Sequence, residues 1–149
     1  MQQSDSENDS TAPPIQGKRG RLRFTDFQFR RASDGRCTVE VELEWSEGQK
    51  VRGTSSGQSS PTVDLRVAAE ATLRAIEAFS EGKMAFDLIG AKSVRAFDAN
   101  VVIVSVENRR EGPRRLLGSC LVEDDPRRGA VLAILGATNR VLGNFVATR

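Results

Sequence analysis

The same succession of sequence patterns occurs twice along the chain, and this repeat limits the possible folds more than any other feature. Residues 18–82 contain three strand-like segments and then a helix-like segment, and residues 83–149 contain the same four in the same order. Corresponding residues lie 61 to 65 positions apart, as in the pairs Asp34 and Asp98, Gly53 and Gly118, and Asp64 and Asp125. The repeat predicts an α+β fold of two tandem βββα units in one domain, related by pseudo-two-fold symmetry, with helices packed on one face of an antiparallel sheet.

In the first unit, alternation of apolar and polar residues marks the strands. The central segment, residues 37–45, has its valines, Leu43 and Trp45 on one face and three glutamates on the other. That pattern is typical of an antiparallel strand with one face in water. A helix is expected over residues 61–79, with Ser60 or Thr62 as its N-cap. The glutamates could be acid–base or metal-binding carboxylates, but a solvated strand face explains them more simply because no histidine is present to complete a metal site.

The second unit is more apolar than the first in two places. Its central strand, residues 101–110, carries Val101 and Ile103 at outward positions, where the first unit carries glutamates. Its helix begins at Pro126 and is apolar on every side over residues 130–135, as a buried helix is. We therefore expect a homodimer in which a second copy covers the following residues: Val101, Ile103, Val131, Leu132 and Leu135. The alternative is that this surplus apolar surface packs on the first unit of the same chain.

The amino-acid composition excludes several classes of enzyme. The chain has no histidine and no tyrosine, so a Ser-His or Cys-His nucleophile is impossible within it. We expect a protein that is not an enzyme, with no catalytic residue, no metal and no cofactor. Its two cysteines are too few for a disulfide framework. Cys37 lies next to Arg36, whose charge could lower the pKa of the thiol.

The N-terminal region differs in composition from the rest. Residues 1–17 are polar and acidic with almost no apolar side chains, so we expect a disordered tail. They lack the basic and apolar regions of a signal peptide, and no apolar run in the chain reaches the ~20 residues that span a bilayer. We therefore expect a cytoplasmic protein without a membrane partner.

The two helix starts resemble those of a known family. The segments SPTVDLRVAA (residues 60–69) and DPRRGAVLAILGATN (residues 125–139) resemble the helices of the C-terminal regulatory domain of 2-isopropylmalate synthase and citramalate synthase. The resemblance covers residues 22–142 and implies the tandem βββα fold and a dimerisation domain. It also implies a branched-chain amino acid effector that binds between the units, near the helix starts. The catalytic barrel of those synthases needs ~250 residues, so only the regulatory module fits in this chain.

Helix N-termini suit such a ligand physically, because their free backbone N–H groups and partial positive charge attract a carboxylate. The candidate ligand-binding residues are Ser59, Ser60, Asp64, Asp125, Arg127 and Arg128. The two arginines have two interpretations. They could neutralise Glu123, Asp124 and Asp125 on a solvated surface, which we favour, or they could hold an anion.

Two other functions stay open. Paired arginines recur along the chain and follow the basic run KRGRLR (residues 18–23), which is compatible with nucleic-acid binding. The glutamate face and the small number of aromatic residues argue against it. A pure protein-assembly module without a ligand is the third possibility.

Overall fold

The structure is a computed structural model that describes residues 21–110 and 114–148, and it confirms two tandem βββα units. The elements in chain order are β2 (Leu22–Arg31), β3 (Arg36–Trp45), β4 (Lys50–Gln58), α2 (Pro61–Phe79), β5 (Phe86–Ala96), β6 (Ala99–Asn108), β7 (Arg114–Val122) and α3 (Pro126–Thr148). The expected tail, residues 1–17, lies outside the described residues. The expected boundary between the units, at residues 82 and 83, falls in the connection between α2 and β5. Within the described ranges, neither helix is long and apolar enough to cross a bilayer.

The strands form two separate antiparallel sheets with the same topology, β2-β3-β4 and β5-β6-β7. Both first strands have an irregularity at the same point, between Phe24 and Asp26 in β2 and between Leu88 and Gly90 in β5. Each third strand has a glycine where the helix of its own unit comes closest. A Cβ atom on Gly53 would collide with helix α2, and one on Gly118 would collide with helix α3. The repeat is therefore preserved in the backbone as well as in the order of the elements.

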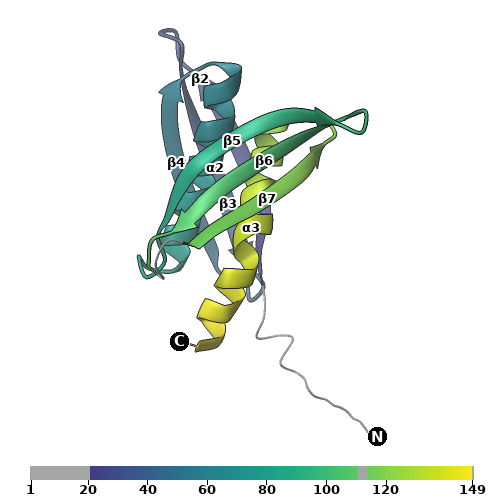
Figure 1. Ribbon diagram of the computed structural model, residues 1–149. Coiled ribbons are helices and arrows are strands. Elements are labelled where there is room, and N and C mark those ends of the chain that lie inside the picture. The colour runs from purple at the N-terminus through teal and green to yellow at the C-terminus, as the bar shows by residue number, and fades with distance from the viewer. Residues whose placement is uncertain (1–20, 111–113, 149) are drawn as a thin grey trace, which may run out of the picture.

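The two helices pack against each other and lie between the two sheets (Figure 1). Helix α2 contacts β3 and β4 of its own unit and β5 of the other, while α3 contacts β6 and β7 of its own unit and β2 of the other. Each first strand thus lies against the helix of the opposite unit. One side chain from each helix holds the first strand of the opposite unit in this position. Asn139 of α3 accepts a hydrogen bond from the Leu22 backbone at 3.0 Å, and Glu77 of α2 accepts one from the Phe86 backbone at 3.4 Å.

This arrangement corrects part of the expected dimer interface. Helix α3 is covered by its own sheet, by α2 and by β2, so its apolar surface is largely satisfied within the chain. Val131 and Leu135 are buried and are not available to a second copy. Leu132 and Ile103 remain 45% and 38% exposed, and Val101 is half-buried. Packing on the first unit therefore covers most of the apolar surface of α3. The outer face of the β5-β6-β7 sheet stays uncovered.

The outer faces of the two sheets differ in chemistry. On the first sheet the three expected glutamates face outward, and Arg52 of β4 pairs with Glu42 at 2.8 Å and with Glu40 at 3.4 Å. Thr25 donates a further hydrogen bond to Glu42 at 2.8 Å. These carboxylates are held in an ion-pair network in which Glu42 is buried, at 9% exposure, so this strand face is less solvated than the simpler interpretation predicts. On the second sheet several large apolar side chains are exposed: Leu117 at 69%, Leu121 at 57% and Ile103 at 38%.

Candidate ligand site between the helix starts

The starts of α2 and α3 meet around a cavity of about 360 Å³. Both units contribute to its lining, which consists of Pro61, Asp64, Leu65, Ser93, Asp125, Pro126 and Arg127. Of the six residues that the sequence predicted, Asp64, Asp125 and Arg127 line this cavity. The structure thus brings together residues that are about 60 positions apart in the sequence, at the place where the repeat predicted a shared pocket.

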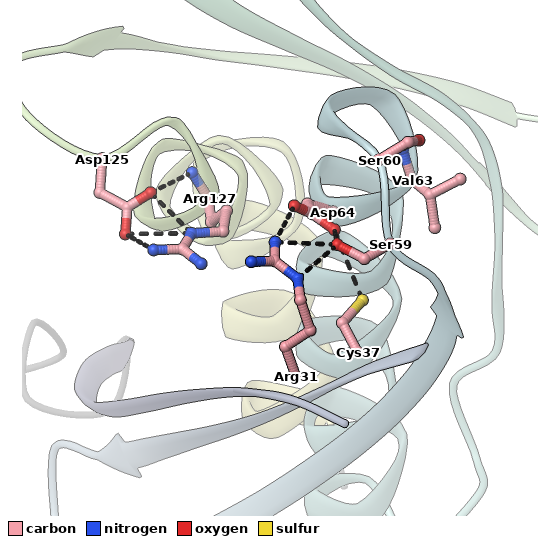
Figure 2. A network of polar contacts seen from close by, with 8 residues as sticks. All are labelled: Arg31, Cys37, Ser59, Ser60, Val63, Asp64, Asp125 and Arg127. Carbon is pink, nitrogen blue, oxygen red and sulfur yellow. Dashed lines mark hydrogen bonds and ion pairs between the residues drawn. The ribbon is translucent and has the colours of Figure 1, made fainter. Parts of the chain in front are cut away.

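At the start of α2, the polar groups are already engaged. Ser60 is the N-cap, and its hydroxyl accepts a hydrogen bond from the Val63 backbone at 3.1 Å. The Ser59 hydroxyl donates to Asp64 at 2.8 Å and accepts from Arg31 at 3.0 Å (Figure 2). The Arg31 guanidinium also lies 3.6 Å from the Asp64 carboxylate. Ser59 and Ser60 therefore cap the helix and orient Asp64, and they do not line the cavity themselves.

At the start of α3, Asp125 both caps the helix and forms an ion pair with a neighbouring side chain. Its carboxylate accepts a hydrogen bond from the Arg127 backbone at 3.0 Å, which caps the helix. It also accepts three from the Arg127 side chain, at 2.8, 2.9 and 3.2 Å, in a bidentate pair (Figure 2). These hydrogen bonds lower the pKa of Asp125 and raise the pKa of Arg127 from their usual values. Neutralisation of Asp125 by Arg127 is thus confirmed, and the pair is only about one-quarter to one-third exposed.

Both arginines of α3 also lie on aromatic rings of the first unit. The Arg127 guanidinium is 4.1 Å from the centre of the Phe29 ring, and the Arg128 guanidinium is 4.7 Å from the centre of the Phe24 ring. Cation–π contacts of this length are worth ~0.5–2 kcal/mol each. They offset the unfavourable position of two cations near a helix N-terminus. Arg128 therefore holds α3 to β2, a role that the sequence interpretation missed, and it does not line the cavity between the helix starts.

The equivalent space over β5 is not filled in this way. Strand register makes Phe27 and Phe29 of β2 equivalent to Ala91 and Ser93 of β5, because each pair lies opposite corresponding residues of the central strands. The two phenylalanines are thus replaced by small side chains. A second cavity of about 630 Å³ follows β5 there, lined by Pro61, Thr62, Leu65, Ile89, Gly90, Ala91, Lys92, Ser93, Ile103 and Ser105. It shares Pro61, Leu65 and Ser93 with the first cavity, so the two adjoin.

The charges around the smaller cavity balance. Asp64 and Asp125 provide two carboxylates, and Arg31 and Arg127 provide two guanidinium groups. A ligand with both a carboxylate and an ammonium group would find a partner of opposite charge for each. Cys37 lies behind Asp64, with its sulfur 3.5 Å from that carboxylate. Burial raises the pKa of the Cys37 thiol and Asp64 raises it further, so the expected lowering by Arg36 is wrong.

Other candidate chemistry finds little support in the described part of the chain. No group of three or more cysteine, aspartate or glutamate side chains there could hold a metal ion. Arg109 and Arg110 form one of the arginine pairs noted in the sequence, and both make local contacts. Arg109 lies 3.2 Å from Asp87, and Arg110 donates a hydrogen bond to the Gly82 backbone at 2.9 Å. Part of the basic run, residues 18–20, lies outside the described residues.

Sequence reasoning found the helix starts but missed the cavity along β5. The missing signal was the contrast between Phe27 and Phe29 in the first repeat and Ala91 and Ser93 in the second. The offset that relates Asp34 to Asp98 already aligns Phe27 with Ala91 and Phe29 with Ser93. A comparison with known protein families finds no match for this chain, and a comparison with curated proteins finds none either. The resemblance to the synthase regulatory domain therefore stays a prediction.

Proposed function

We propose that this chain is a non-catalytic regulatory and dimerisation module that binds a small carboxylate or an amino acid between the starts of α2 and α3. The observation that supports this most directly is the cavity of about 360 Å³ between the two helix starts. Its volume lies within the range of ~300–1,000 Å³ that is typical of small-molecule sites. Its lining combines Asp64, Asp125 and Arg127 with apolar side chains.

The arrangement favours a ligand with separated charges on a short apolar body. Arg127 is oriented by Asp125 and by the Phe29 ring, so it needs little ordering when it meets a carboxylate. Asp64 is held by Ser59 and Arg31 and lines the cavity, so an ammonium group bound there would share this carboxylate with Arg31. Pro61 and Leu65 supply an apolar wall beside these groups.

A thermal melt tests the proposal. Leucine, isoleucine, valine and small dicarboxylates would each be added at millimolar concentration. A ligand at a hundredfold over its Kd stabilises the folded state by ~2.7 kcal/mol, which raises the Tm of a domain this size by several degrees. Each variant is compared with its own ligand-free melt, so a change in basal stability does not affect the result.

Two neighbouring arginines provide matched variants. Arg127→Lys keeps the charge but loses the bidentate geometry at the cavity, so we expect it to reduce the ligand-induced shift. Arg128→Lys makes the same change one residue away, outside this cavity, and should leave the shift intact. A flat panel for the unmodified protein would refute the ligand-binding proposal, as would an equal loss of shift in both variants.

The dimerisation part of the proposal rests on the outer face of the β5-β6-β7 sheet. Leu117, Leu121 and Ile103 are exposed on neighbouring strands, and Val101 pairs with Leu121 across the ladder. Contiguous apolar surface of this kind is characteristic of protein interfaces. A two-fold dimer would bring the same face of two copies together. Nucleic-acid binding stays an alternative, and salt-dependent binding of a DNA duplex or RNA to the same protein sample would favour it.

A further inference from the structure

We propose that the cavity along β5 accepts the apolar body of an amphipathic carboxylic acid, with its carboxylate at Arg127. This inference rests on the proposed ligand site and names a ligand class for it that is larger than an amino acid. The adjoining cavity of about 630 Å³ is larger than the polar one, and its lining is mainly apolar. A ligand that used both cavities would therefore place most of its atoms along β5.

The larger cavity arises from specific residues. At the positions of Ala91 and Ser93 the first unit has phenylalanines, which pack under Arg127 and Arg128. On β5 this volume is left unfilled. Gly90 lies on the opposite face of β5, where it pairs with Ser105, and a Cβ atom built on it meets no atom within 4 Å, so the cavity continues around the strand toward Ile103. Its lining includes exposed apolar side chains, Ile89 at 44% and Ile103 at 38%, so an apolar ligand bound there would remove from water apolar surface that the chain itself leaves exposed.

The two cavities are arranged as a polar end and an apolar end. Arg127, Asp64 and Asp125 belong only to the smaller cavity, whereas Ile89, Ala91 and Ile103 belong only to the larger one. Pro61, Leu65 and Ser93 line both and form the junction. A carboxylate at Arg127 therefore directs an attached hydrocarbon chain past Leu65 toward β5.

The test is a chain-length series measured by isothermal titration calorimetry. Straight-chain carboxylates from four to ten carbons would be titrated into the protein, with the alcohols of the same lengths as uncharged probes. Each methylene group that becomes buried should tighten binding about four-fold until the cavity is filled. The alcohols should show the same increase with length but weaker binding at every length, because they lack the ion pair with Arg127.

Two glycine-to-leucine variants test whether the hydrocarbon chain lies along β5. Gly90→Leu introduces a side chain into open space on β5, so we expect the protein to fold and the dependence on chain length to disappear. Gly136→Leu adds the same side chain on α3, where a Cβ atom also meets nothing within 4 Å, and should leave the dependence unchanged. A ligand-free melt of both variants establishes that each is folded.

The outcomes separate this inference from the proposed function. Carboxylates that bind equally at every length would overturn the inference and leave the polar site standing. Alcohols and carboxylates that bind equally well, with affinity rising with length, would support an apolar site along β5 but refute the carboxylate at Arg127. A dependence on chain length that survives Gly90→Leu would overturn the location along β5. If neither series binds, the inference is overturned, and the thermal melt decides separately whether amino acids bind.

Discussion

The two first strands, β2 and β5, share a backbone path but differ in what covers their inner faces. Phe24, Phe27 and Phe29 of β2 form an aromatic surface on which Arg127 and Arg128 lie. The matching stretch of β5 has Leu88, Ala91 and Ser93, and a cavity lies beside it. One half of the molecule is thus closed by side chains of its own chain, while the equivalent half is open.

This difference indicates how a duplicated fold can acquire a site. The elements that the units share, such as the close approach at Gly53 and Gly118, build the scaffold and need to be the same in both. Residues that differ between the units do not disturb the scaffold, because they lie where the first strand faces the opposite helix. The candidate site is at one of these positions, and its closed counterpart shows how the same space looks when it is filled.

The largest expected effect comes from opening the closed half. Phe29→Ser gives β2 the residue that β5 carries at the same position, and it removes the ring under Arg127. We expect the free energy of unfolding to fall by about 2–3 kcal/mol, because a half-buried ring and its cation–π contact are lost together. Urea denaturation measures the change.

The reciprocal substitution, Ser93→Phe, sharpens the same comparison. It adds the ring of the first unit to a space that is empty in the second, so we expect the free energy of unfolding to change by less than about 1 kcal/mol. The variant should also lose any ligand-induced shift in Tm. Equal destabilisation by Ser93→Phe and Phe29→Ser would mean that the two positions are packed alike, contrary to the comparison.

A smaller effect is expected from the helix caps, which also differ between the units. Helix α2 is capped by the neutral Ser60, and α3 by the charged Asp125. Ser60→Ala should cost about 1 kcal/mol at any pH between 3 and 8. Asp125→Asn keeps a capping side chain, so it should cost less at neutral pH.

The two caps should respond differently to acid. The pKa of Asp125 is lowered in the folded protein, so its contribution to stability is present above the usual carboxylate pKa and is lost as the pH falls toward the lowered one. The Asp125→Asn variant should therefore lose less stability than the unmodified protein between pH 5 and pH 2.5, measured by denaturation at each pH. An unchanged acid profile in Asp125→Asn would show that the ion pair with Arg127 contributes nothing.

The smallest effect on stability is expected on the outer faces. Leu121 of β7 and Ser56 of β4 are equivalent positions, each three residues after the glycine that contacts the helix. Leu121→Glu and Ser56→Glu should each change the free energy of unfolding by about 0.5 kcal/mol or less, since both residues are exposed. Sedimentation velocity should find a dimer for the unmodified protein and Ser56→Glu, and a monomer for Leu121→Glu. A monomer in all three samples would contradict the proposed dimer.

Much of the scaffold could be predicted because it depends on local patterns. The alternation over Val39–Trp45 and the proline and capping residues at Ser60 and Asp125 identify their elements without tertiary information. The repeat then brings the helix starts together. The sequence did not show which helix covers which first strand. That pairing depends on contacts between residues more than 100 positions apart, such as Leu22 and Asn139.

The misassigned interface residues have the same cause. Val131 and Leu135 were interpreted as surplus apolar surface that a second copy would cover, but both are buried. They belong to a helix that contacts α2 and β2 of the first unit as well as its own sheet. Arg128 was interpreted as a partner for nearby acids, but its ring partner, Phe24, comes from the other unit and is more than 100 positions away.

The packing of each first strand against the helix of the opposite unit also affects how the chain folds during synthesis. Strand β2 is made before all the other described elements, and the helix that covers its aromatic face, α3, is made after them. Until α3 emerges, the phenylalanines of β2 and the backbone of Leu22 have no partner from the second half. The first unit therefore cannot complete its folding before the second is made, and the two units must close together once α3 has emerged from the ribosome.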